Sequence, residues 1–171
     1  MLEGWDQYYF LLASAAVGLI GLLFVVVTLT AGAEEQKATR GARLYMTPTM
    51  FHFAVVFVIS AIASIGRAGD MLIIPSVGIA AIVGIVHTFP RALELREPGA
   101  AEHWTDFWFY GIIPVAGYIA LGLVAATLYY ATPDAVYFLA LMMMAFILLG
   151  IRNAWDLVTY IAPRSKPADK Q

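Results

Sequence analysis

Few side chains in this sequence could do chemistry, because most of the chain is apolar. The polar residues that interrupt its long apolar segments fall into three groups: Thr47, Thr49 and His52; His87 and Arg91; and Arg152, Asn153, Asp156 and Tyr160. Ionisable and polar groups inside a membrane segment are costly, and they usually mark a ligand, ion or proton pathway. We therefore take these nine residues as one candidate polar site.

The chemistry that these residue types favour is the binding or conduction of a small solute or ion. Arg152 and Asp156 stand four residues apart, so that they can pair along one face of a helix. A purely structural interpretation stays open. The Arg152 and Asp156 pair can anchor a helix where it leaves the bilayer, Arg91 can extend toward the interface, and His52 can be a neutral histidine hydrogen-bonded inside a bundle.

A b-type haem is the alternative for the two histidines. Histidines on facing helices can be the axial ligands of haem iron, which would make the protein an electron carrier through His52 and His87. His87 is expected to lie several ångströms shallower in the membrane than His52, and this difference in depth counts against the haem. No other cofactor and no metal is predicted.

Several functional classes find no support in the sequence. The chain has no cysteine, which excludes disulfides and thiolate metal sites. It has a net charge of −2 and no basic patch, so nucleic acid is not an expected partner. His-Glu-x-x-His, Gly-x-Ser-x-Gly and phosphate-loop motifs are absent from the sequence. Enzyme activity is therefore not expected.

The elements that must position the polar residues are membrane-spanning helices. Hydrophobic residues make up 61% of the chain and charged residues 13%, whereas a typical soluble domain is roughly a quarter charged. A hydrocarbon core of about 30 Å is crossed by about 20 apolar residues. We predict an all-α transmembrane bundle within residues 1–162 and a disordered tail over 163–171. The five predicted spans are about 8–32, 44–66, 71–90, 107–131 and 135–156.

The basic residues predict how the bundle is oriented. With five spans, all of the ten lysines and arginines except Arg67 fall on one side of the membrane. By the positive-inside rule this side is the cytoplasm, so the C-terminus is cytoplasmic and the N-terminus is outside. The first segment is expected to be an uncleaved span, because no basic residue precedes it. All three polar groups then lie in the cytoplasmic half of the bundle.

Small residues and prolines modify the predicted spans. Ser14 and Gly18 stand four residues apart, a spacing that lets helix backbones approach each other in lipid. The spacing is compatible with packing inside one bundle, and also with the homo-oligomer that we predict. Pro75 and Pro114 lie inside the third and fourth spans, where each removes a backbone donor and should kink its helix.

Three segments resemble a known family. They are Gly-Leu-Ile-Gly-Leu-Leu-Phe-Val-Val-Val-Thr-Leu-Thr at 18–30, the Thr-Pro-Thr-x-x-His-Phe segment at 47–53, and Ile-Arg-Asn-Ala-Trp-Asp-Leu-Val-Thr-Tyr at 151–160. Together and in this order they resemble a family of small, uncharacterised bacterial inner-membrane proteins. The resemblance implies a bacterial source and brings no established activity.

The sequence thus predicts a multi-pass protein of the bacterial inner membrane, surrounded by the lipid bilayer. As its function we predict an oligomeric, channel-like or transport-related role with the polar site on the cytoplasmic side. The alternatives are a structural or regulatory membrane partner without a ligand, and the haem-binding electron carrier.

Overall fold

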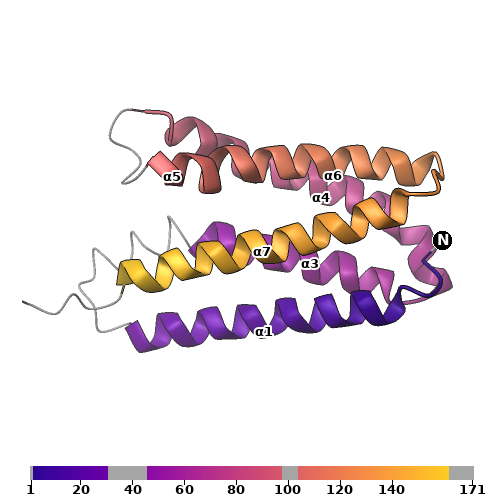
Figure 1. Ribbon diagram of the computed structural model, residues 1–171, viewed down its shortest axis with the longest axis horizontal. Helices are drawn as coiled ribbons and strands as arrows, with labels where there is room; N and C mark the ends of the chain where they lie inside the picture. The colour runs from indigo at the N-terminus through magenta and orange to yellow at the C-terminus, as the bar shows by residue number, and fades with distance from the viewer. Residues whose placement is uncertain (1, 31–45, 98–103, 162–171) are drawn as a thin grey trace, which may run out of the picture.

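The computed structural model describes residues 2–30, 46–97 and 104–161, and this part of the chain is helical with no strand (Figure 1). The elements are α1 (Asp6–Thr30), α3 (Thr47–Ala63), α4 (Arg67–Glu94), α5 (Trp104–Asp106), the π-helical segment η2 (Phe107–Ile112), α6 (Ile113–Tyr129) and α7 (Ala135–Ile161). For the described residues, the predicted all-α fold is confirmed.

In the described part of the chain, four stretches of helix are long and apolar enough to cross a membrane. They are the greater part of α1, α4 and α7, and the continuous stretch Trp104–Tyr129 that contains α5, η2 and α6. The remaining long helix, α3, is apolar but has 17 residues, or about 26 Å at 1.5 Å per residue. The fold is therefore that of a multi-pass membrane protein, and α3 is the one predicted span whose length falls short.

The helix boundaries differ from the predicted spans at polar ends. Helix α4 begins at Arg67, four residues before the predicted span, and α7 continues to Ile161 instead of 156. The predicted spans stop near charged residues, whereas a helix continues for as long as its backbone hydrogen bonds are made. The predicted first loop and the tail over 163–171 lie outside the described residues.

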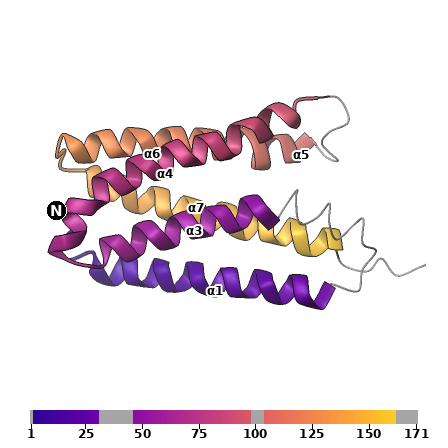
Figure 2. The same ribbon diagram turned by 180° about the vertical axis from the view of Figure 1, so that it is seen from behind.

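The helices alternate in direction along the bundle. Figures 1 and 2 show α1, α4 and α7 running one way and α3 and α6 running the other. One end, which we name the turn end, holds the α3–α4 and α6–α7 connections and the start of α1. The other, which we name the cavity end, holds the first residues of α3 and the last residues of α4 and α7.

Helices α3 and α4 form a hairpin that is tight at the turn end and open at the cavity end. Gly66 ends the turn with a φ of 70°, which favours glycine. A Cβ on Gly69 would stand 2.3 Å from the backbone oxygen of Ile62, so the two helices touch backbone to backbone there. From this apex they diverge (Figure 2), because α4 packs mainly against α6 and α3 packs mainly against α1.

The core at the middle of the bundle is aromatic. Phe53 and Tyr118 are fully buried and Phe146 nearly so. Two of these rings occupy recesses left by glycines: a Cβ on Gly84 would come within 2.1 Å of the Tyr118 ring, and a Cβ on Gly150 within 2.3 Å of the Phe53 ring. The absence of a side chain at two positions thus fixes how α4 meets α6 and how α3 meets α7.

Candidate functional site

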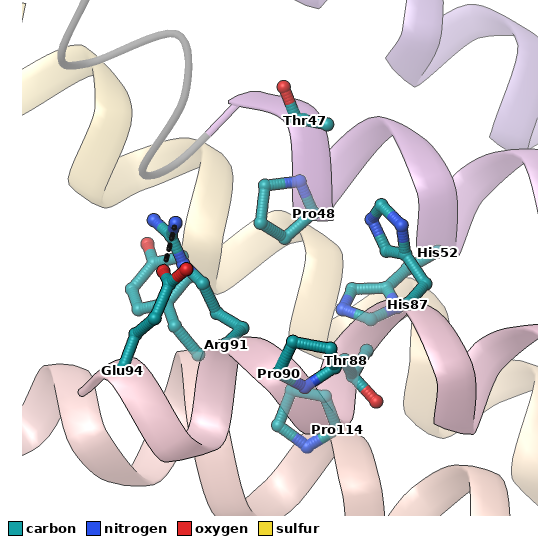
Figure 3. A pocket seen from close by; sticks show the side chains of 10 residues that line it. Thr47, Pro48, His52, His87, Thr88, Pro90, Arg91, Glu94 and Pro114 are labelled. Carbon is teal, nitrogen blue, oxygen red and sulfur yellow. Dashed lines mark ion pairs between the residues drawn. The ribbon is translucent and has the colours of Figure 1, made fainter. Parts of the chain in front are cut away.

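A polar cavity of about 180 Å³ opens at the cavity end of the bundle, between the start of α3, the end of α4 and the η2–α6 segment (Figure 3). Four of the predicted site residues line it, namely Thr47, His52, His87 and Arg91. The other lining residues are Pro48, Thr88, Pro90, Glu94, Tyr110 and Pro114. The structure therefore brings the first two predicted groups, except Thr49, together in one place.

Three prolines from three helices shape the cavity wall. Pro48 lies in the first turn of α3, where proline is tolerated. Pro90 lies inside α4 and cannot donate to the carbonyl of Val86, four residues earlier. Pro114 follows the π-helical segment Phe107–Ile112, and π-helical turns often occur at functional sites. Irregular backbone at membrane depth is tolerated where it lines a cavity, which is the arrangement found here.

His52 is the most buried polar residue of the cavity wall, with a completely buried side chain. Its Nδ1 lies 2.8 Å from the Tyr118 hydroxyl oxygen, within hydrogen-bond distance. Its ring stacks on Phe146 with the ring centres 5.7 Å apart. Among the described residues Nε2 has no hydrogen-bond partner. His52 is therefore fixed on one side, and its second ring nitrogen is buried without a partner among the described residues.

His87 and Arg91 lie one turn apart near the end of α4. The His87 ring stacks on Phe51 with the centres 4.4 Å apart, which holds the imidazole at the cavity wall. The Arg91 guanidinium is 3.5 Å from the Glu94 carboxylate, and their side chains are 20% and 70% exposed. Figure 3 shows this ion pair at one side of the cavity and the two histidines at the other. The wall thus joins the Arg91–Glu94 ion pair with imidazole ring nitrogens and hydroxyls.

The third predicted group lies beside the cavity and is linked to it by Tyr110. Arg152 pairs with Asp156 on α7, as the four-residue spacing predicts. The Tyr110 hydroxyl stands 3.1 Å from Oδ2 of Asp156 and 3.2 Å from the backbone oxygen of Asn153, so it can donate to either. Because Tyr110 also lines the cavity, it connects the pair on α7 to the polar wall.

Aromatic contact holds the Arg152 side chain in place. Its guanidinium carbon lies 3.5 Å above the centre of the Phe109 ring, a favourable cation–π geometry. Phe109 and Tyr110 are consecutive residues of η2, so one π-helical turn contacts both members of the ion pair. This contact supports a structural role for Arg152 in addition to its charge.

The remaining predicted residues lie apart from the cavity wall. Thr49 and Asn153 are completely buried, but neither lines the cavity. Among the described residues, both side-chain polar atoms of Asn153 lack a hydrogen-bond partner. Tyr160 lies in the last turn of α7, and its side chain falls outside the described part of the structure.

Sequence reasoning missed the two tyrosines that organise the site. Tyr110 and Tyr118 belong to a chain with nine tyrosines, and neither sits in a polar pattern. One signal pointed toward Tyr110, since it stands four residues before Pro114 and the irregular backbone near an internal proline often lines a cavity in membrane proteins. No local signal pointed toward Tyr118, because its partner His52 is 66 residues away.

Comparison with known proteins adds no relative: no protein-family model, no curated protein and no solved structure matches this chain. The resemblance to small bacterial inner-membrane proteins stays an expectation from the three quoted segments. The haem alternative also stays a prediction. His52 and His87 do line the same cavity, and the ring nitrogen of His52 that Tyr118 leaves available is Nε2.

Proposed function

We propose that this protein is a five-span bacterial inner-membrane protein that binds or conducts a small polar solute or ion through the cavity at the cytoplasmic end of its bundle. In this proposal it is channel-like or transport-related and works as a homo-oligomer. The observation that carries the proposal is His52, a completely buried residue whose Nε2 has no partner among the described residues and which lines a polar cavity.

The size and lining of the cavity support a small polar ligand. Sites for drug-sized molecules usually measure roughly 300–1,000 Å³, and this cavity measures about 180 Å³. A buried polar group without a hydrogen bond costs about 1–3 kcal/mol by mutational measures. A ligand or water that meets Nε2 of His52 removes this cost, so the histidine favours a polar occupant.

Five crossings are supported by the alternating directions of the five long helices (Figure 1). If α3 did not cross, α1 and α4 would be consecutive crossings and would have to run in opposite directions. They run the same way instead, and α3 runs against both of them from one end of the bundle toward the other. The cytoplasmic placement of the cavity rests on the distribution of lysine and arginine.

The alternative of a structural or regulatory membrane partner has one observation in its favour. Helix α1 lies at the edge of the bundle, and only 22% of its most apolar 18-residue stretch is buried inside the protein. No atom of the described residues lies within 4 Å of a Cβ added to Gly18 on this helix. Under this alternative, Gly18→Leu disrupts association with a partner or a second copy. Crosslinked complexes that are unchanged by Gly18→Leu would count against it.

The test of the proposed function is flux through proteoliposomes. Potassium, chloride and proton gradients are followed with ion-sensitive dyes, and small neutral solutes are followed by light scattering. We expect at least one species to cross faster than in empty vesicles, and His52→Ala to abolish that flux while the protein still assembles. Thr28→Ala, an exposed polar residue of α1 outside the cavity, is the matched control. Equal flux for the parent protein, His52→Ala and empty vesicles rejects the proposal.

A further inference from the structure

A second hollow lies along the seam between α3 and α4, next to the polar cavity. It has a volume of about 330 Å³ and an almost entirely apolar wall. Phe51, Ala54 and Val58 line it from α3, and Ser76, Ala80 and Val83 line it from α4. The hollow opens on the outer surface of the bundle, since Val58 is 50% exposed and Val83 is 47% exposed. We name this hollow the seam groove.

The seam groove and the polar cavity follow one another along the same faces of α3 and α4. On α4, residues at helical spacing lead from Val83 in the groove to His87 and Arg91 in the cavity. On α3, the same spacing leads from Phe51 to Thr47. Phe51 lines the groove and stacks on His87, which lines the cavity. The stacked rings therefore mark the boundary between an apolar and a polar half.

The geometry of the hairpin explains why the seam stays open. The helices touch at Gly69 and diverge from there (Figure 2). Ala54, Ser76 and Ala80 line the widening gap with small side chains, which do not fill it. The sequence thus leaves an apolar groove whose end at Phe51 and Val83 lies next to the polar cavity.

We propose that this seam binds one single-chain amphiphile, with its small oxygen-bearing head in the polar cavity and its hydrocarbon tail in the seam groove. A fatty acid is the simplest molecule of this class. This inference rests on the proposed function, because it uses the same cavity as the binding site. It goes further by naming the class of ligand.

The head is assigned by the groups that face it. Arg91 is a hydrogen-bond donor at all pH values, and either ring nitrogen of a histidine can carry the donor proton. These groups suit a carboxylate or carbonyl oxygen. The carboxylate of Glu94 also lines the cavity, but it is 70% exposed and paired with Arg91. The head must also be small, because the cavity measures about 180 Å³.

The tail is assigned by the length and width of the groove. From Ser76 to Val83 the α4 wall spans seven residues, about 10 Å at 1.5 Å per residue. A single groove of about 330 Å³ holds one chain. A two-chain lipid would leave its second chain outside the seam, in the bilayer.

The experiment is photolabelling with a dodecanoic acid that carries a diazirine in its chain, on the full-length protein in phosphatidylcholine vesicles. Labelled peptides are identified by mass spectrometry. We expect label to concentrate on α3 between residues 51 and 59 and on α4 between 76 and 83, and excess dodecanoate to compete for it. Ala54→Leu places a larger side chain in the groove, where it should compete with the tail for space. Overpacking of this kind is destabilising, so we expect the label to fall about tenfold. Ala116→Leu, also an exposed alanine but on α6, should leave the label unchanged.

A second comparison tests the head. In the parent protein, dodecanoate should compete with the label much better than dodecane, which has no head. His87→Phe keeps an aromatic ring against Phe51 and removes both ring nitrogens, so it should reduce this difference. Label spread evenly over the exposed faces of all helices, or equal competition by dodecane in the parent protein, overturns the inference. Both labelling results are independent of the flux assay. If His52→Ala abolishes flux but no label appears in the groove, the amphiphile inference fails and the proposed function stands.

Discussion

The hydrogen bond between His52 and Tyr118 offers the sharpest test of how the site is held together. It joins α3 to α6, and both side chains are completely buried. The Tyr118→Phe variant removes one oxygen atom and leaves the ring against Phe146, on which it stacks with the centres 4.7 Å apart. The change therefore isolates the hydrogen bond from the packing around it.

The size of the effect follows from what remains in the core. In Tyr118→Phe, Nδ1 of His52 joins Nε2 as a buried nitrogen without a partner among the described residues. Leaving one buried polar atom unpaired costs about 1–3 kcal/mol in water-soluble proteins, whereas hydrogen bonds between helices in membranes average about 0.6 kcal/mol and reach about 1.7. Because neither side chain is exposed, we expect a loss near the upper membrane value, about 1.5 kcal/mol.

A double-mutant cycle measures this coupling. The free energies of unfolding of the parent, Tyr118→Phe, His52→Leu and the double variant are measured by titration with SDS in mixed micelles, with helix content followed by circular dichroism. Removing both polar partners is much less costly than removing one. The double variant should therefore be more stable than the sum of the two single losses predicts, by about 1–1.5 kcal/mol.

Additive losses would refute this reasoning. If the sum of the single changes matched the double variant within about 0.3 kcal/mol, the usual limit for independent sites, the two side chains would not share a hydrogen bond. His52 would then have to be held by packing alone, and the availability of its Nε2 could no longer be deduced from the contact at Nδ1.

Three further changes test other parts of the fold, each by the same unfolding measurement. Gly84→Ala places a Cβ 2.1 Å from the Tyr118 ring and should cost about 1–3 kcal/mol. Its control, Gly78→Ala on the same helix, meets no atom of the described residues within 4 Å and should be neutral or slightly stabilising. Equal effects of the two changes would show that the recess at Gly84 is not needed. Asn153→Leu replaces a buried amide without partners among the described residues and should stabilise the bundle by about 1 kcal/mol, and a large loss would reveal a partner. Tyr110→Phe removes the link from the cavity to α7 and should cost about 0.5–1.5 kcal/mol, and no change at all would show that the link is not formed.

Composition predicted much of the fold because a lipid bilayer permits few kinds of backbone structure. Four of the five predicted spans coincide with described helices that are long and apolar enough to cross a membrane, and the second coincides with the shorter helix α3. In lipid the backbone must satisfy its own hydrogen bonds, which leaves helices as the solution for isolated apolar segments. Length is the one property on which α3 falls short, since its helix stops at Ala63 to make the tight turn into α4.

The candidate site was predictable by residue type and less so by geometry. The cost of polar groups in lipid singled out His52, His87 and Arg91 from sequence, and the structure places them on one cavity. The same reasoning grouped Arg152 and Asp156 with them, whereas these two lie beside the cavity and reach it through Tyr110. A local pattern cannot tell which neighbouring helix a side chain faces.

The sequence alone determined that this chain is helical, that it is built for a bilayer, and that its few polar side chains gather toward one end. These properties depend on the cost of transferring each residue into lipid, which is local and additive. The tertiary structure decided which groups meet: Tyr118 with His52 through the recess at Gly84, and the polar cavity with the seam groove through Phe51 and His87. Such pairings depend on where helices touch and where they diverge, and close packing of whole surfaces sets these contacts.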